Sequence, residues 1–242
     1  MIGTVASVWR YPVSSLAGEE LPAIAVRRGG IEGDRLYGVV DVETGDIARP
    51  TEAKWHAVPH IAARLAPGGE LEIAVPGSRW YAAPGERADR VASEFLGFAV
   101  TIRPLNGEAG DDGLSPVAHA RYVKAPVHLL TSASLARLKA LHPDGQADAR
   151  RFRPSLVVDM PEVEGHFPET EWIGKSLTIG GTQLRIVEPC RRCGFTILAQ
   201  RGLDHDPNIL RNLVRHNSHN IGVYCSVEKE GVVSPGDAMR FV

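Results

Sequence analysis

Short apolar runs, separated by turns rich in glycine and proline, follow one another along the whole chain. Runs of this length with many β-branched residues are typical of strands rather than helices. Many short strands at such intervals favour a barrel or strongly bent sheets. The predicted strands are the run opened by Val5, Val8 and Trp9 and the segments 36–42, 71–75, 99–103, 127–130, 156–159, 176–179, 183–187, 194–199, 221–227 and 238–242.

Three other segments repeat apolar residues at the spacing of a helix. One spans 86–96, a second follows Thr131 or Ser132, either of which can cap it, and a third begins at Asp206-Pro207. The residues expected to face the core are Val91, Phe95 and Leu96 in the first, Leu135, Leu138 and Leu141 in the second, and Leu210, Leu213 and Val214 in the third. The chain is therefore predicted to be of the α+β class, mainly β, with a few helices.

The composition excludes several classes of protein. The chain has 242 residues and a formal net charge of −2, whereas a nucleic-acid-binding protein would carry a strongly basic domain or stripe. The sequence shows no basic and apolar leader at its start and no apolar span long enough to cross a membrane. Three cysteines, an odd number, fit a reducing compartment better than a disulfide framework. We expect a cytoplasmic protein with no nucleic-acid or membrane partner.

Two of the three cysteines flank an arginine pair in the segment Cys190-Arg191-Arg192-Cys193, directly after a strongly patterned strand. Guanidinium groups favour the thiolate form of a nearby cysteine, and the thiolate is the form that attacks electrophiles or binds metal. The pair is therefore a candidate for nucleophilic, redox or metal chemistry, against the alternative of two inert thiols.

Two common uses of a Cys-x-x-Cys pair fit this sequence poorly. Structural zinc needs four ligands, and His216 and His219 miss the usual spacing of a zinc finger. A thioredoxin-type dithiol lies between a strand and a helix, whereas 194–199 is predicted to be another strand. This argues against the thioredoxin fold but leaves redox chemistry open.

Arginines cluster at two places. Arg150, Arg151 and Arg153 enter the predicted strand 156–159, and Arg191 and Arg192 end another strand. A single arginine is most simply a solvated surface charge. Two clusters beside a cysteine point instead to an anionic ligand, because guanidinium groups match phosphate and other oxyanions in geometry.

These motifs belong to a longer series that is spread over nearly the whole chain. The series comprises WRYPVSS at 9–15, GDR at 33–35, PVHLLTSASL at 126–135, RFRP at 151–154, WIG at 172–174, PCRRCG at 189–194 and GVVSPGD at 231–237. In order and spacing it resembles the MOSC proteins, the molybdenum cofactor sulfurase C-terminal fold. The similarity is to members with an N-terminal β-barrel region, such as the mitochondrial amidoxime-reducing component.

The resemblance implies a MOSC-type β-barrel packed closely against an N-terminal β-barrel region. It places the N-terminal region at 1–110 and the MOSC domain at 111–242, together forming one compact unit. The segment 106–117, rich in glycine, aspartate and proline, is the expected boundary between the two lobes or a mobile excursion.

The resemblance also implies a molybdenum cofactor in its phosphate-bearing molybdopterin form. Cys193 aligns with the cysteine that binds molybdenum, and Cys190 with a neighbour that does not. A soft thiolate suits this metal. The positions implied to contact the cofactor are Ser14, Ser15, Arg35, Thr131, Ser132, Arg151, Arg153, Arg191 and Arg192, although helix capping would explain Thr131 and Ser132 equally well.

One position departs from the family pattern. Ser14 stands where relatives usually have a lysine that contacts the cofactor. Loss of a charge-assisted hydrogen bond would weaken binding by about 1.5 to 3 kcal/mol. Arg191, where the eukaryotic relatives often have a serine, is a candidate to compensate.

The function implied is a molybdenum cofactor-dependent reductase that removes oxygen from N-hydroxylated small molecules such as amidoximes, hydroxylamines or N-hydroxylated bases. Electrons would come from a separate reductase or ferredoxin-like partner, because the chain lacks a cysteine cluster for iron and sulfur. Asp34 and His128 are candidate proton donors, against structural roles for both. Two alternatives stay open: a carrier of cofactor or sulfur through a Cys190 or Cys193 persulfide, and an anion-binding barrel with a reactive thiol and no metal.

Overall fold

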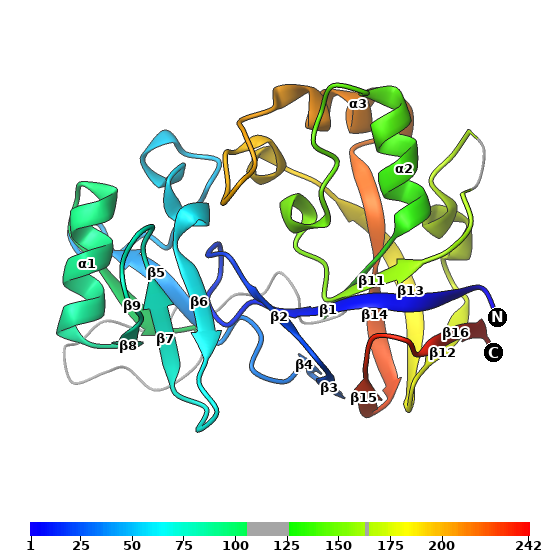
Figure 1. Cartoon of the computed structure of the whole chain (residues 1–242), viewed down its shortest axis with the longest axis horizontal. Helices are drawn as coiled ribbons and strands as arrows, with labels where there is room; N and C mark the ends of the chain where they lie inside the picture. The colour runs from blue at the N-terminus through cyan, green and yellow to red at the C-terminus, as the bar shows by residue number, and fades with distance from the viewer. Residues whose placement is uncertain (106–125, 163–164) are drawn as a thin grey trace.

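The chain forms a large closed barrel and a smaller lobe beside it, as seen in a computed structural model that describes residues 1–105, 126–162 and 165–242 (Figure 1). Seven strands form the wall of the barrel in the order β11-β10-β14-β13-β12-β16-β1, and pairing of β1 with β11 closes it. Only β10 and β11 pair in parallel. The bounds are β1 (Gly3–Arg10), β10 (Val127–Thr131), β11 (Leu156–Asp159), β12 (Ser176–Ile179), β13 (Thr182–Arg191), β14 (Asn220–Lys229) and β16 (Ala238–Phe241).

Alternating side chains of these strands fill the barrel with one apolar core. Val5 and Val8 of β1 lie in this core beside Leu156 and Val158 of β11. The N-terminal strand is therefore part of the same barrel as the C-terminal strands. Short strands extend this unit: β2 (Glu19–Leu21) pairs with β1, and β3 (Ile24–Arg27), β4 (Gly30–Ile31) and β15 (Gly231–Val233) form a separate sheet.

The smaller lobe is built from residues between β4 and the first gap. It contains the pair β5 (Tyr37–Asp41) and β9 (Val100–Pro104), the sheet β6 (Ala62–Leu65), β7 (Leu71–Ala74) and β8 (Tyr81–Ala83), and helix α1 (Glu86–Leu96). Two turns of 3₁₀-helix, Ala53–Trp55 and Val58–His60, bring Trp55 and Val58 into its core. The lobe thus has a hydrophobic centre of its own.

Helices α2 (Ser132–Leu141) and α3 (Pro207–Asn217) cover the upper end of the barrel (Figure 1). Thr131 caps α2 by accepting a hydrogen bond from the Ser134 N–H at 3.1 Å, and Asp206 caps α3 in the same way through Asn208. Helix α2 lies between the parallel strands β10 and β11, as a crossover connection requires. The helix starts predicted from capping residues are confirmed.

The predicted α+β, mainly β class and all three helices are confirmed. The strand predicted at 194–199 is wrong: Gly194–Ile197 is a turn of 3₁₀-helix. Thr196 donates both its N–H and its hydroxyl to the carbonyl of Cys193, at 3.2 and 3.0 Å, and so closes a turn. Val214 was also predicted to face inward, but it is exposed and Ile209 takes the buried position. The predicted boundary near 110 and the whole segment 106–117 lie outside the described residues.

Candidate functional site

The two cysteines of the Cys-Arg-Arg-Cys segment have opposite environments. Cys190 lies at the end of β13, where register shifts in the pairing with β14 turn its side chain inward, and it is buried. Cys193 follows the strand and is exposed. The next residue, Gly194, faces the smaller lobe, since a Cβ there would lie 3.8 Å from the Thr51 side chain. Cys193 is thus the accessible thiol beside the gap between barrel and lobe.

Cys190 sits in a cluster of polar side chains inside the barrel end. Arg192 Nη1 donates to Cys190 Sγ at 2.7 Å, and the rings of His128 and Tyr224 lie next to each other with centroids 5.5 Å apart. Burial raises the pKa of the Cys190 thiol, but the Arg192 guanidinium, together with His128 and Tyr224, lowers it to about 6. The Arg192 guanidinium therefore favours the thiolate form of Cys190, with which it pairs.

This cluster also holds the loop that precedes β11. Arg192 Nη2 donates to the carbonyl of Phe152 at 2.8 Å, and His128 Nδ1 lies 3.3 Å from the carbonyl oxygen of the next residue, Arg153. Two consecutive backbone carbonyls are thereby fixed, one from β10 and one from the residue that follows β13. The backbone of Arg153 adopts a left-handed conformation with φ of 53°.

Arg151 is fully buried, and its guanidinium forms hydrogen bonds to backbone carbonyls of the protein. Its guanidinium donates to the carbonyls of Gln146, Thr196, Leu198 and Asp204 at 2.7 to 3.4 Å. These bonds hold the segment after Cys193 against the loop before β11. A contact between Arg151 and a cofactor stays a prediction, and the structure supplies a structural reason for an arginine here.

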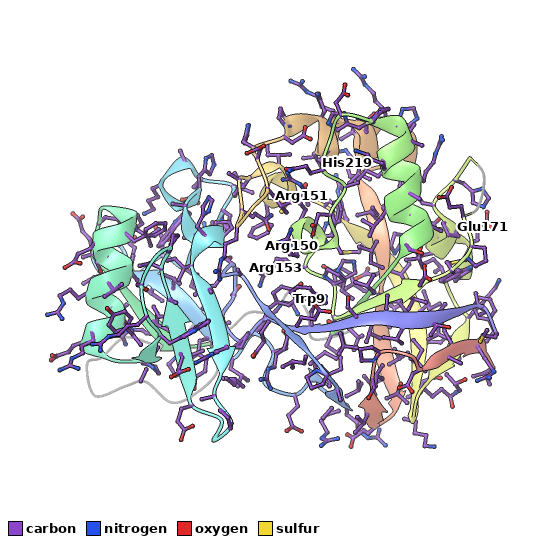
Figure 2. All side chains as sticks on the ribbon, in the orientation of Figure 1. Trp9, Arg150, Arg151, Arg153, Glu171 and His219 are labelled. Atoms are coloured by element: carbon purple, nitrogen blue, oxygen red, sulfur yellow. The ribbon has the colours of Figure 1, made fainter. Side chains whose placement is uncertain are left out.

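Arg153 lines a cavity of about 310 Å³ where barrel and smaller lobe meet. Its guanidinium lies 4.2 Å from the centroid of the Tyr11 ring and 5.3 Å from that of Phe195, and it donates to the carbonyl of Leu16. Figure 2 shows Trp9, Arg150 and Arg153 together on the barrel side of this region. The lining residues are Trp9, Tyr11, Ala17, Gly18, Pro59, Arg150, Arg153, Phe195, Gln200, Arg201 and Leu203.

The loop after β1 brings further predicted residues to Tyr11. Arg35 pairs with Asp34, and its guanidinium lies 5.8 Å from the Tyr11 ring centroid. Asp34 also accepts from the Tyr11 N–H at 2.6 Å, so it is an ion-paired structural carboxylate. Ser14 and Ser15 are half-buried, and the Ser15 hydroxyl reaches the Ala48 carbonyl at 3.4 Å. Arg35 and Arg153 therefore both lie beside the Tyr11 ring, and a contact of either with a cofactor stays a prediction.

Thr131 and Ser132 have protein partners at the start of α2. The Thr131 N–H and hydroxyl both donate to Glu169 Oε1 at 2.8 Å, and the Ser132 hydroxyl donates to Asp159 at 2.7 Å. Burial raises the pKa of Glu169, which accepts these bonds inside the protein. The capping interpretation is confirmed for Thr131, and a cofactor contact by either hydroxyl stays a prediction.

Two residues at the cavity escaped the sequence analysis as site residues. The Tyr11 hydroxyl and Gln200 Nε2 are buried and meet no hydrogen-bond partner among the described residues. Tyr11 belongs to a recognised motif, but its ring gave no chemical signal beside the arginines. Gln200 gave no signal in the sequence either, because it reaches the cavity only through the fold of segment 194–203. Across the described ranges, no three His, Cys, Asp or Glu side chains gather as a protein-only metal site, and no helix is long and apolar enough to span a membrane.

Comparison with known proteins agrees with this architecture. Among solved structures, the YuaD protein from Bacillus subtilis is similar over 99% of this chain and 94% of its own, with 14% identity and a TM-score of 0.50, which supports the fold alone. YiiM from Geobacillus stearothermophilus matches 49% of this chain and 54% of its own, with 16% identity and a TM-score of 0.38. No curated protein matched the chain. Residues 2–112 match the MOSC N-terminal beta barrel domain and residues 110–240 the MOSC domain, so the chain belongs to the MOSC family, which is associated with binding of the molybdenum cofactor.

Proposed function

We propose that this protein holds the molybdenum cofactor at the junction of barrel and lobe and reduces N-hydroxylated small molecules. The observation that carries the proposal is the contrast between the two cysteines. Cys193 is exposed beside the junction, whereas Cys190 is buried and bonded to Arg192. Only Cys193 can reach a metal outside the barrel without rearrangement.

The residues around the junction fit the cofactor. A thiolate is a soft ligand, and Cys193 would supply it, with the remaining sulfur ligands coming from the cofactor. Arg35 and Arg153 face the Tyr11 ring and suit an anionic group such as a phosphate. Arg191 is exposed two residues before Cys193 and would add a further cation in place of the lysine replaced by Ser14.

The cofactor, when bound, would supply the change of oxidation state, and the chain would bind and orient it. The substrate oxygen would leave as water, with electrons from a separate reductase or ferredoxin-like partner and protons from solvent. Asp34 is ion-paired with Arg35, and His128 is engaged with the Cys190 cluster. We therefore assign neither residue as the proton donor.

The test uses protein purified from a host that makes the cofactor. We expect molybdenum in stoichiometric amount in the wild type and in Cys190→Ser, and its loss in Cys193→Ala. Reduction of benzamidoxime with a chemical electron donor should follow the metal content of the three proteins. Metal that survives in Cys193→Ala, or loaded protein that leaves benzamidoxime unchanged, would contradict the proposal.

A carrier function is the second candidate, and the exposure of Cys193 favours it. An accessible thiol could pass sulfur or cofactor to an acceptor protein, whereas the buried Cys190 could not do so directly. Incubation of loaded protein with a cofactor-free molybdenum enzyme separates the two functions. Rapid activation of the acceptor, without reduction of benzamidoxime, would favour the carrier.

A further inference from the structure

The two helices that cover the upper end of the barrel carry charges of one sign (Figure 1). Helix α2 contains Arg137 and Lys139, helix α3 contains Arg211 and Arg215 next to His216, and neither helix contains an aspartate or a glutamate. The whole chain has a formal net charge of −2, and helix α1 of the smaller lobe mixes both signs. The cationic end is therefore a local feature and does not follow from the composition.

The arginines of α3 are exposed and lack carboxylate partners. Arg211 donates to the neutral side chain of Asn208 at 3.2 Å, and neither Arg211 nor Arg215 forms an ion pair within residues 1–105, 126–162 and 165–242. The negative end of the helix dipole favours Arg215 and His216 in the last turn, but not Arg211 in the middle of the helix. Like charges four residues apart on a helix repel each other. Helix stability therefore does not explain this pair of arginines.

The C-terminal half of α3 lies beside the segment that presents Cys193. The helix packs against the 3₁₀ turn Gly194–Ile197, which follows Cys193 directly. Just after the helix, the His219 carbonyl accepts a hydrogen bond from the Arg192 N–H at 2.8 Å. The cationic surface therefore adjoins the proposed molybdenum ligand.

The same half of the helix also exposes an apolar side chain. Val214 is 42% exposed and lies between Arg211 and Arg215 in the sequence. The carboxylates of Asp204 and Asp206 come before the helix and so lie at its opposite end. An apolar contact among cations suits a partner with an acidic surface, because complementary charges steer two proteins together and fix their orientation.

We propose that the α3 face, formed by Arg211, Val214, Arg215 and His216, docks an acidic electron-carrier protein of the ferredoxin type. This inference rests on the proposed function, in which a separate protein supplies the electrons. Removal of one oxygen from an N-hydroxylated substrate as water consumes two electrons from the carrier and two protons from solvent. A one-electron carrier must therefore dock and leave twice in each turnover, which a small interface steered by charge allows. Docking beside Cys193 keeps the distance to the metal short.

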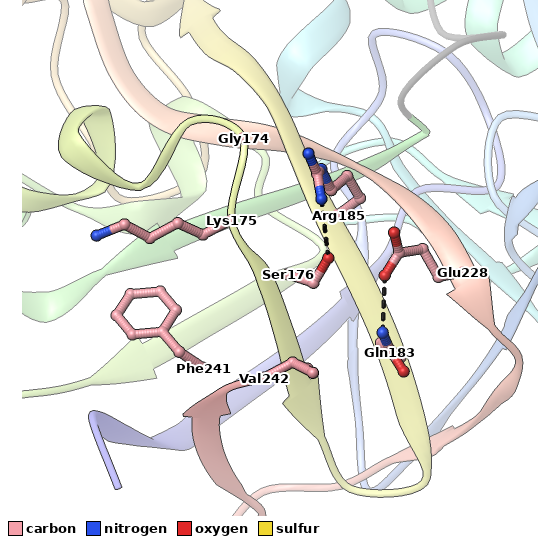
Figure 3. A pocket seen from close by; sticks show the side chains of 8 residues that line it. All are labelled: Gly174, Lys175, Ser176, Gln183, Arg185, Glu228, Phe241 and Val242. Carbon is pink, nitrogen blue, oxygen red and sulfur yellow. Dashed lines mark hydrogen bonds between the residues drawn. The ribbon is translucent and has the colours of Figure 1, made fainter.

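Exposed cations on another part of the barrel provide a matched control (Figure 3). Lys175 and Arg185 line a pocket of about 640 Å³, but Glu228 lines the same pocket. Arg185 precedes Arg191 by six residues on β13, which places it roughly 20 Å away along an extended strand. Reversal of the charge at Arg185 therefore matches reversal at Arg211 in size but lies far from the α3 face.

The first test measures binding of an oxidised, acidic [2Fe–2S] ferredoxin to molybdenum-loaded protein by NMR or calorimetry at low salt. The variant that carries both Arg211→Glu and Arg215→Glu should raise the Kd roughly tenfold or more, as expected for loss of electrostatic attraction. Glutamine at both positions should raise it less, and Arg185→Glu should leave it unchanged. High salt should weaken binding of the wild type most, because exposed charges are screened. Equal molybdenum content confirms that the variants are folded.

The second test measures the rate at which loaded protein oxidises reduced ferredoxin in the presence of benzamidoxime. The rate should fall in the same order as the affinity. Reduced methyl viologen, a small cation, serves as the comparison donor. Its rate should fall in none of the variants, because it needs no docking face and is not attracted by cations.

Three results would overturn the inference. These are no binding of the ferredoxin, equal weakening by Arg185→Glu and the double α3 variant, or binding of single-stranded DNA or anionic vesicles to the α3 face in place of ferredoxin. If methyl viologen does not support reduction of benzamidoxime, the proposed function fails, and the binding measurements still decide the docking face. If benzamidoxime is reduced but the α3 variants bind and oxidise ferredoxin like the wild type, only this inference fails.

Discussion

The inner and outer halves of the Cys-Arg-Arg-Cys segment do different work although they look symmetrical in sequence. Cys190 and Arg192 face into the barrel end, bond to each other and hold the Phe152 carbonyl. Arg191 and Cys193 face outward and are exposed. Side chains alternate between the two faces of a strand, and register shifts at the end of β13 add to this, so the two cysteines and the two arginines point to opposite sides. The side on which each residue lies, and not its type, therefore decides whether it has a structural or an exposed role.

The largest expected effect separates the two arginines. Arg192→Ala would leave a buried thiolate without its cation and a carbonyl without its donor. We expect a loss of about 3 kcal/mol in the free energy of unfolding, the low end for breaking a buried pair, because Arg192 is not fully buried. Arg191→Ala should change it by less than about 0.5 kcal/mol. Equal losses in urea unfolding would abolish the distinction between inner and outer sides.

The second test compares the two thiols in protein made without the cofactor. Iodoacetamide should label Cys193 in the native state, whereas Cys190 becomes reachable only when the barrel end opens. Local opening of a packed region should slow labelling of Cys190 by about a hundredfold or more, which corresponds to about 2.7 kcal/mol. Peptide mass spectrometry over time measures both rates, and Cys225, also buried, serves as the control.

The third test concerns the exposed side of the segment and restores the lysine that relatives usually have at position 14. Ser14→Lys should retain the cofactor more tightly, by about 1.5 kcal/mol for one charge-assisted hydrogen bond. Arg191→Ser, if Arg191 compensates for the missing lysine, should release cofactor, and the double variant should recover it. Molybdenum content after dialysis measures retention. A fall in cofactor occupancy in Ser14→Lys would contradict this assignment.

The last test concerns pH and the inner side alone, and its effect per pH unit is the smallest of the series. The pKa of Cys190 is about 6 in the folded protein, below its ordinary value of 9.0. Its thiolate therefore stabilises the fold fully above the ordinary value, and this contribution is lost as the pH falls through about 6. Between these limits the slope is at most about 1.4 kcal/mol per pH unit. Urea unfolding across this range should show a weaker pH dependence in Cys190→Ser, and an unchanged profile would mean that Cys190 is a neutral thiol.

Local signals in the sequence were enough for several features of the fold. Asp206 and Pro207 marked the start of α3, and Thr131 marked that of α2, because capping is decided by neighbouring residues. The strand predicted at 194–199 failed because its apolar pattern also fits a 3₁₀ turn, and the bonds from Thr196 to Cys193 decide between them. Val214 failed because the inward face of α3 depends on what the helix packs against.

The site shows the same limit more sharply. The sequence indicated arginines near a thiol, but it did not distinguish Arg151, whose donors all meet protein acceptors, from Arg153, which lines the cavity. That difference depends on the left-handed backbone at Arg153. Tyr11 and Gln200 gain their importance from lacking a partner, which only the folded arrangement reveals.

The position of β1 has a consequence for how the barrel is made. Val8 pairs opposite Leu156, and Gly3 opposite Met239, so the first strand synthesised must wait for strands near the end of the chain (Figure 1). Contacts between residues so distant in sequence slow folding, because the loop between them must be ordered first. Until then the edges of β11 and β16 stay open to other chains. The same strand leads into Tyr11, so the cavity is completed only when the ring closes, and ligand binding reports on the last step of assembly.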